Sequence, residues 1–424
     1  MLTIPRRGFL LGSAATLGAG LLAVRRTALA NGTRPPRRLI IAMAGGGWDP
    51  TVTLDPKPGM STIDVLPGTV QDFDGLPVYV DGSRPAVASF FTEYASLCTI
   101  VNGIQVQSLN HPDCAKRLLT GTSSDTNADV GAMTAHALAP DLAAPYLVLG
   151  QTAFSGPYAS ISARAGTASQ LGTLLDPARA YAPADDPMNF APRLPLDATE
   201  EQLIRAHVSA RAERQLAARG QLGENQRRLQ DFIDSLQRGD ALAAADFGSF
   251  AYTGDFGVQA TLAVDLLEAG LSHTAQIELG GWDTHTNNLL QIPQWEQFFT
   301  GLRTLIDALA SRPGLEAGDS MLDDTVVLVA SEMARTPKLN AQGGKDHWPV
   351  TSAMLIGGGL PGGRVLGGTD DGQLGLTVDL QTGLPSAGGS LIQYGNFAAG
   401  VLEAVGVDAG GYLPGVEPFG ALCG

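Results

Sequence analysis

Histidines and carboxylates that follow short apolar runs are the side chains in this sequence best suited to chemistry. Only six histidines occur in the 424 residues, and His111, His285 and His347 lie in loops marked by Gly, Asp or Pro. Imidazole nitrogens and carboxylate oxygens are the donors that Zn²⁺, Mn²⁺ and related divalent ions accept in proteins. We therefore expect the metal ligands to be five residues from four loops: Asp49, Asp283, His285, Glu332 and His347.

A ligand set of this kind is sufficient for one or two ions. Two ions a few ångströms apart hold the attacking and leaving oxygens of a phosphoryl or sulfuryl transfer, which explains the use of mixed donors. Each residue also has a structural alternative. Asp49 follows three glycines and could cap a turn, and Asp283 could cap a helix. Glu332 could form a local ion pair with Arg335, and His347 could be a hydrogen-bonded residue at a strand edge.

Asn110, His111 and Arg335 are the residues expected to contact the substrate. Asn110 and His111 directly precede a proline in the first turn of a predicted helix, where an anion can bind, although a turn or cap is the alternative. The guanidinium of Arg335 suits bidentate binding of two phosphate or sulfate oxygens. Asp346 either accepts the second N–H of a ligating imidazole or is solvated.

The loops that carry these residues follow predicted strands. Apolar runs predict strands at 39–44, 97–101, 273–279, 325–330 and 350–356. Helical periodicity predicts helices at 114–119, 258–268, 295–310 and 391–405, and a helical hairpin insertion at about 197–247. This alternation predicts an α/β fold with a doubly wound, mostly parallel sheet and helices on both faces. Ligands bind beyond the carboxyl ends of the strands in such sheets, where the polar residues fall.

Residues 1–30 have the pattern of an export signal. Arg6 and Arg7 precede a weakly apolar run, and Ala28-Leu29-Ala30 supplies small residues for a signal peptidase. The pattern resembles the twin-arginine signal, which predicts export of the folded protein by the twin-arginine machinery to the periplasm or the exterior. The run is short and contains glycines, so we expect no stable transmembrane anchor after cleavage.

Composition limits the classes of partner. The chain has 16% charged and 44% hydrophobic residues, which is typical of a globular protein, and its net charge is −15. Removal of the leader leaves 23 basic against 42 acidic residues, a net charge of −19. An acidic chain without a basic stripe argues against a nucleic-acid partner. The three cysteines, Cys98, Cys114 and Cys423, are too few for a disulfide scaffold and lack the close pairing of a thiolate zinc site.

Four motifs follow one another in order along the second half of the chain. They are Gly280-Gly281-Trp282-Asp283-Thr284-His285, Ser331-Glu332-Met333-Ala334-Arg335-Thr336-Pro337, Gly343-Gly344-Lys345-Asp346-His347-Trp348-Pro349, and Gly357-Gly358-Gly359 through Gly367-Gly368-Thr369-Asp370. From about Arg38 to its end the chain resembles the secreted bacterial family catalogued as domain of unknown function 1501, whose members usually carry a twin-arginine signal. That family is similar to the alkaline phosphatase superfamily, which includes sulfatases. The resemblance implies a single alkaline phosphatase-like α/β domain over residues 31–424 with a bimetal site.

The resemblance implies the same five metal ligands as the residues themselves, although this sequence departs from the superfamily pattern. One departure is the spacing of Asp283 to His285, which is tighter than usual. Glu332-Met333 stands where the superfamily has an Asp-His pair, so the second metal loses an imidazole. Asn110-His111 stands where the nucleophile is expected, and the Cys-x-Pro-x-Arg motif of sulfatases is missing from the sequence.

Two functions follow as hypotheses. The first is an exported, metal-dependent hydrolase-like protein that acts on a small anionic phosphate or sulfate ester, through a metal-activated water or an atypical nucleophile. The alternative is a catalytically silent binding or assembly protein of the cell envelope that retains the fold. The unusual nucleophile position favours the alternative, and convergence of the five candidate ligands would favour the first.

Overall fold

The computed structural model describes residues 36–165, 197–219, 223–244 and 254–424. The predicted export signal at 1–30 therefore lies outside the described residues.

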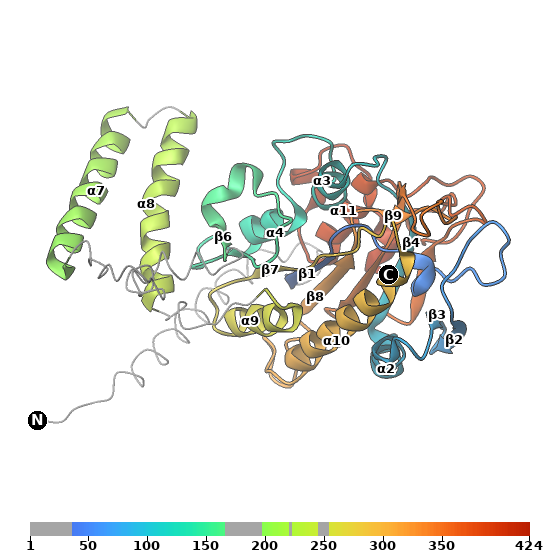
Figure 1. Cartoon of the computed structure of the whole chain (residues 1–424). Coiled ribbons are helices and arrows are strands. Elements are labelled where there is room, and N and C mark those ends of the chain that lie inside the picture. Colours follow the sequence, from blue (N-terminus) through green and yellow to red (C-terminus); the bar gives the residue numbers. More distant parts are fainter. Residues whose placement is uncertain (1–35, 166–196, 220–222, 245–253) are drawn as a thin grey trace, which may run out of the picture.

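An eight-stranded sheet forms the centre of the described chain (Figure 1). Its middle strand β1 (Arg38–Ala44) pairs in parallel with β7 (Thr274–Leu279) on one side and β8 (Thr325–Ala330) on the other. The strand order is β12-β4-β11-β8-β1-β7-β5-β6. This topology confirms the prediction of a doubly wound, mostly parallel sheet. The other strands are β4 (Cys98–Gln105), β5 (Tyr146–Val148), β6 (Ser162–Arg164), β11 (Val350–Gly357) and β12 (Arg364–Gly367).

Strand β11 runs antiparallel to both of its neighbours, β8 and β4. The reason lies in the connection before it. After β8 the chain stays at the carboxyl edge of the sheet through 331–349, so the next strand must enter from that edge. Within this connection β9 (Ala334–Arg335) and β10 (His347–Trp348) form a short antiparallel ribbon. The ribbon places His347 directly opposite Arg335.

Both faces of the sheet are covered, as predicted. Ile40, Ala42 and Ala44 of β1 contribute to one core, and Leu39 and the other odd-numbered residues contribute to the second, because side chains alternate along a strand. The first core includes residues of α2 (Pro85–Tyr94), α9 (Phe256–Glu268) and α10 (Gln291–Ala310). The second includes residues of α3 (His111–Thr120), α4 (Val130–Leu138) and α11 (Tyr394–Ala404). Figure 1 shows these two helix groups on opposite sides of the sheet.

The helix α3, which carries His111, has clear end signals. The Asn110 side chain accepts a hydrogen bond from the Asp113 backbone N–H at 3.2 Å, and Pro112 lies in the first turn. Gly121 ends the helix in the left-handed conformation, which costs glycine little. His111 is thus fixed as the first residue of the helix.

The predicted helical hairpin is present as α7 (Ala198–Arg219) and α8 (Gly223–Ala244). Arg205 near the start of α7 pairs with Asp240 near the end of α8, as antiparallel helices require. Arg238 donates to the carbonyls of Ser160 and Pro140, which ties the hairpin to the sheet end that carries β6. In Figure 1 the hairpin projects outward from that end. None of the helices in the described ranges has the length and apolar character that a membrane crossing requires.

Two further strands, β2 (Thr69–Phe73) and β3 (Leu76–Val80), form a separate antiparallel hairpin. Short 3-10 helices extend two of the site loops: η1 (Pro50–Val52) follows Asp49, and η5 (Asn288–Leu290) precedes α10.

Candidate metal centre

Loops that follow parallel strands bring the polar residues to one edge of the sheet. Asp283 and His285 follow β7, Glu332 and Arg335 follow β8, and His111 follows β4 at the start of α3. The ribbon of β9 and β10 adds His347 from the segment that precedes β11. The carboxyl ends of parallel strands meet at the same edge, so residues far apart in sequence become neighbours.

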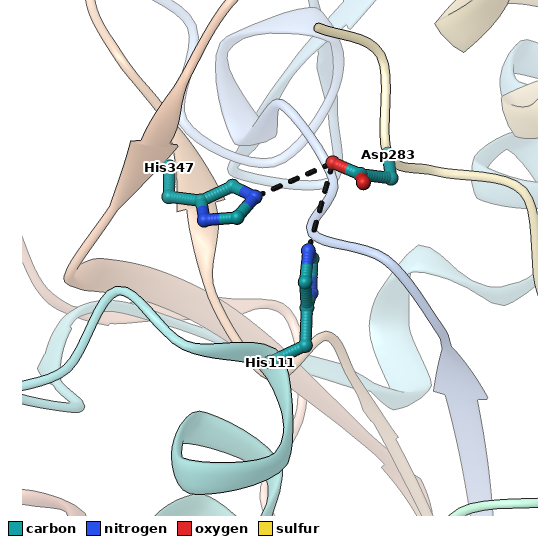
Figure 2. A group of neighbouring side chains, drawn as sticks. All are labelled: His111, Asp283 and His347. Carbon is teal, nitrogen blue, oxygen red and sulfur yellow. Dashed lines mark hydrogen bonds and ion pairs between the residues drawn. The ribbon is translucent and has the colours of Figure 1, made fainter.

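Three imidazoles converge on one carboxylate oxygen. The Asp283 Oδ1 atom lies 3.1 Å from His285 Nε2, 3.3 Å from His347 Nε2 and 3.6 Å from His111 Nε2. The Nε2 atoms of His285 and His347 are 2.8 Å apart. Figure 2 shows His111 and His347 pointing toward Asp283 from separate elements. One ligand atom each from His111, Asp283 and His347 lies within 4.8 Å of the others.

The opposite nitrogen of each ring has a hydrogen-bond acceptor. His111 Nδ1 lies 2.8 Å from Glu332 Oε1, His285 Nδ1 lies 2.9 Å from Asp346 Oδ1, and His347 Nδ1 lies 2.6 Å from the Leu109 carbonyl. A carbonyl and an ionised carboxylate can only accept, and Glu332 Oε1 already accepts the Gly46 N–H at 2.8 Å. Each ring therefore carries its proton on Nδ1. In the neutral form each Nε2 atom presents a lone pair toward the Asp283 carboxylate, and His111, Asp283 and His347 form the group whose ligand atoms all lie within 4.8 Å of one another.

This arrangement fits a divalent ion. Tetrahedral ligands at the usual zinc bond lengths are separated by about 3.3 Å, and the distances from Asp283 Oδ1 to the Nε2 atoms of His347 and His111, 3.3 and 3.6 Å, are close to that value. Within the described residues the buried His111 Nε2 atom has no hydrogen-bond partner. Lone pairs facing each other across 2.8 Å, as in His285 and His347, repel unless a cation lies between them. A metal-binding imidazole usually donates its other N–H to a carboxylate or carbonyl, as all three rings do here.

Electrostatics keep Asp283 ionised and favour the protonated form of His111. Burial opposes the charge of Asp283, but the hydrogen bond and charge of Arg335 outweigh it and hold the Asp283 pKa below its ordinary value. The hydrogen bond to Glu332 raises the pKa of His111, against the effect of partial burial. Hydrogen bonds from His285 and Asn340 lower the pKa of Asp346.

Arg335 takes a different role from the one expected. Its side chain is fully buried, donates from Nε to the Gly47 carbonyl at 2.8 Å, and donates from Nη2 to Asp283 Oδ1 at 2.7 Å. Nη1 donates to the Lys345 carbonyl at 3.2 Å, and Nη2 also reaches the Gly46 carbonyl. With its donors used inside the protein, Arg335 does not present a bidentate face to a substrate. It holds the Asp283 carboxylate and the glycine loop instead.

Glu332 also differs from the expectation of a metal ligand. Its Oε1 atom accepts from His111 Nδ1 and from the Gly46 backbone, and Ser331 Oγ donates to Oε2 at 3.2 Å. The Glu332 carboxylate thus contacts Nδ1 of the His111 ring, whereas Asp283 lies near Nε2 on the opposite side of the ring. Glu332 orients the His111 ring and does not belong to the group of converging donors.

Asp49 lies apart from the converging donors, in a fully buried ion pair. Its Oδ2 atom is 2.8 Å from Lys345 Nζ and accepts from Asn288 Nδ2 at 3.1 Å. Its Oδ1 atom accepts from the Thr51 hydroxyl at 2.6 Å, and η1 begins directly after it. The turn-capping alternative therefore describes its surroundings, because both oxygens are taken by protein donors.

The loop after β1 needs glycines, because other segments of the site approach its backbone closely. Gly46 has a φ of +123° and Gly47 a φ of +81°, where side chains are strained. A Cβ on Gly46 would lie 2.7 Å from the Asp283 backbone nitrogen. Beneath the loop, the buried ring of Trp48 stacks on Trp295 at 5.1 Å and meets Trp282 edge-on at 6.5 Å. Trp48 and Trp282 thereby provide a rigid support for the neighbouring site residues.

No conventional nucleophile stands at the start of α3. Asn110 caps the helix with its side chain, and the Ser108 hydroxyl accepts the Asn110 N–H at 3.2 Å. Cys114 is buried, its thiol contacts the Ser108 carbonyl, and burial raises the thiol pKa to about 11. Asn110 is exposed and close to His111 in the chain, but its oxygen serves the helix. His111 itself, expected at the substrate, lies among the converging donors.

Sequence reasoning missed the residues that orient the site. The Leu109 carbonyl gives no sequence signal, because any residue supplies one. Lys345 adjoins Asp346 and His347 within one motif, and that adjacency was the available signal for its partnership with Asp49. Asp346 accepts the His285 N–H, which is one of the two roles considered for it, but the ring it serves is not its sequence neighbour.

Among solved structures the chain is similar to the PsFucS1 sulfatase from Pseudoalteromonas sp., with 8% identity, a TM-score of 0.39, and coverage of 97% of this chain and 76% of that one. It is also similar to the lipoteichoic acid synthase LtaP from Listeria monocytogenes, with 10% identity, a TM-score of 0.37, and coverage of 91% and 76%. A third is the lipooligosaccharide phosphoethanolamine transferase EptA from Neisseria meningitidis, with 11% identity, a TM-score of 0.36, and coverage of 93% and 62%.

Similarities at this level of identity do not assign a substrate to this chain. No curated protein matches it. A family profile is more specific: residues 36–382 match the family described as Protein of unknown function (DUF1501), and the chain belongs to that family.

Proposed function

We propose that this protein is an exported, metal-dependent hydrolase that acts on a phosphate or sulfate ester. The observation that carries the proposal is the convergence of three Nε2 atoms on Asp283 Oδ1, with an acceptor behind every ring. The inference of a phosphate or sulfate ester as substrate is based on the order of the sequence motifs. The inference of export is based on the residues of the leader. The proposed donors are His111, Asp283 and His347, with His285 next to Asp283 and His347.

The donor set favours one ion over two. Asp49 and Glu332, which would complete a second site, are engaged with Lys345 and His111. Three nitrogens and one oxygen suit zinc better than manganese, because manganese prefers oxygen-rich sites. A divalent ion there would supply Lewis-acid chemistry. It would neutralise charge on the ester and lower the pKa of water, so that hydroxide is available as the nucleophile at neutral pH.

The chain's own residues prepare the site for this chemistry. Glu332, Asp346 and the Leu109 carbonyl hold the Nδ1 protons and thereby aim each Nε2 lone pair. Arg335 keeps Asp283 ionised and in place. Asp283 and His285 have side chains 48% and 40% exposed, so an ester can approach from the solvent side. Water is the nucleophile, because Ser108 and Cys114 are both engaged with the backbone.

A catalytically silent envelope protein is the second candidate. The observation that favours it is the missing nucleophile at the start of α3, where Asn110 serves as a helix cap. In that case the ion would only join the loops that follow β4, β7 and β8.

The deciding experiment combines metal analysis with an ester screen on the exported protein. We expect about one zinc per chain, and hydrolysis of at least one ester among phosphate monoesters, phosphate diesters and sulfate esters. His285→Ala and His347→Ala should lose both the ion and the activity. His136→Ala is the matched control, because His136 stacks on Tyr158 and contacts Tyr412 on the α4 side of the molecule.

The outcomes separate the two candidates. One ion per chain without hydrolysis of any ester supports the silent protein, and a chain without a stoichiometric ion contradicts the metal-dependent hydrolase. Export is tested separately, by replacing Arg6 and Arg7 with lysine and measuring the fraction of protein outside the cytoplasm. A normal exported fraction in that variant would contradict a twin-arginine route.

A further inference from the structure

Exposed leucines lie on the loops at the edge of the sheet that carries the candidate metal centre. Large apolar side chains are usually buried, and a group of them around a site marks a binding surface. Five such leucines lie on loops that follow the carboxyl ends of strands, the edge that carries the centre. We name this set the apolar rim: Leu109 (55% exposed), Leu289 (56%), Leu290 (51%), Leu339 (45%) and Leu374 (51%).

Hydrogen bonds tie the rim segments to the site residues. The Leu109 carbonyl accepts a hydrogen bond from His347 Nδ1 at 2.6 Å, so the backbone of this leucine contacts the His347 ring. Leu339 precedes Asn340, whose side chain donates to the His285 carbonyl at 2.9 Å and to Asp346 Oδ1 at 3.1 Å.

The other three rim leucines lie on segments that are hydrogen-bonded to residues near the site and not to the converging donors themselves. Leu289 and Leu290 follow Asn288, which donates to Asp49 and whose backbone N–H reaches the Gly343 carbonyl. Leu374 follows Gln373, whose carbonyl accepts from the indole of Trp348, the neighbour of His347.

Positive charge on these loops is already neutralised. Lys57 contacts Asp55 and the Thr369 carbonyl, and Lys338 pairs with Asp64 at 2.9 Å. Lys345 and Arg335 are buried against Asp49 and Asp283. A multiply charged sugar sulfate or an anionic membrane surface would therefore meet leucines and carboxylates here, with few cations to bind it.

We infer that the substrate is a single amphiphilic ester, whose charged group binds at the metal centre and whose apolar chain lies on the apolar rim. This inference rests on the proposed function and specifies its substrate class. An apolar chain removes leucine surface from water without requiring a free cation on the protein, and each buried methylene strengthens binding. A bound divalent ion would compensate the charge of the ester group, which is one negative charge for an alkyl sulfate and about 1.5 to 2 for an alkyl phosphate at neutral pH.

The test measures binding of alkyl phosphates and alkyl sulfates to the zinc-loaded full chain, below their micelle concentrations. Methyl, butyl, hexyl and octyl esters form the series. We expect affinity to rise by up to about fourfold for each methylene that is fully buried on the rim, along part of the series. Two variants test the rim: the double variant Leu289→Ser/Leu290→Ser and the single variant Leu339→Ser. In both, the increase of affinity with chain length should become smaller, while the affinity for methyl phosphate stays unchanged. Leu203→Ser is the matched control, because Leu203 is 66% exposed on the α7 hairpin.

Other outcomes overturn the inference in distinguishable ways. Equal affinity for methyl and octyl esters contradicts an apolar-chain site but leaves the hydrolase proposal intact. Zinc-loaded protein that binds none of the esters contradicts both. If the protein sediments with phosphatidylglycerol vesicles but does not bind monomeric esters, the rim is a membrane contact and the inference is wrong. A concentration-dependent dimer that the double variant abolishes would make it a contact between two copies of the chain.

Discussion

The Glu332 carboxylate and the His111 imidazole are joined by a hydrogen bond of 2.8 Å between Oε1 and Nδ1. This contact decides which nitrogen of the ring is protonated, and it leaves His111 Nε2 directed toward Asp283. Glu332 is itself held by the Gly46 N–H and the Ser331 hydroxyl. The orientation of one metal donor therefore depends on the loops after β1 and β8 together.

Replacement of Glu332 by glutamine should weaken metal binding without removing a converging donor. The amide is similar in shape but carries no charge to stabilise the His111 N–H, and loss of such a partner typically costs tenfold to a hundredfold in affinity. Competition with a chelator measures the change in zinc affinity. Glu224→Gln on α8 is the matched control, because Glu224 forms an exposed pair with Arg228 one helical turn away. Unchanged affinity in the Glu332 variant would show that the hydrogen bond does not orient the ligand.

Zinc affinity should increase with pH. The His111 pKa is raised above 6.5 by Glu332, so a proton competes for Nε2 until the pH exceeds that raised value. In the metal-free protein the sign is opposite: the stability gained from protonated His111 is present below pH 6.5 and is lost as pH rises through the raised pKa. Calorimetric titrations between about pH 5.5 and 8 check the first trend, and melting temperatures of metal-free protein check the second. A flat zinc affinity over this range would contradict the assignment of His111.

Removal of Lys345 should destabilise the fold strongly. Lys345→Met leaves the buried Asp49 carboxylate without its counter-charge, and breaking a buried pair in this way costs about 3–5 kcal/mol. The double variant Asp49→Leu/Lys345→Met should recover part of that loss, because no charge is then buried alone. Urea unfolding measures both. Lys338→Met is the control, since the exposed Lys338–Asp64 pair is worth at most about 1 kcal/mol. Equal stability of the Lys345 and Lys338 variants would contradict the buried pair.

Asp129 should make the fold less stable as pH rises from about 4 to 6. Burial raises its pKa to about 6 from an ordinary 3.8, although the backbone of Ala132 and Phe154 and the Tyr146 hydroxyl donate to it. The folded state thus binds a proton more tightly than the unfolded state, so the contribution of Asp129 is largest below pH 4 and declines through pH 6. Asp129→Asn cannot titrate, so its stability deficit relative to the natural protein should shrink over this interval by on the order of 1–3 kcal/mol. A deficit independent of pH would show that Asp129 is ionised throughout.

The central sheet was predictable because its signals are local. The apolar run at 325–330 matches β8 residue for residue, and the alternation of strands and helices is sufficient for a doubly wound sheet. The antiparallel direction of β11 was not predictable, because it depends on where the chain lies after 331–349. The start of α10 at Gln291, four residues before the predicted Trp295, reflects a proline in the first turn, where helices tolerate it.

The sequence by itself determined which side chains are available and that they would meet at one edge of the sheet. Asp283, His285 and His347 were identified in this way, since strand-end loops in a parallel sheet share an edge. Only the tertiary structure decided the direction of each side chain. Arg335 points inward because β9 pairs with β10, and Asp49 faces Lys345 because both are buried beneath the glycine loop. Residue type and spacing carry no information about such long-range pairing, which is fixed by packing between segments that are distant in sequence.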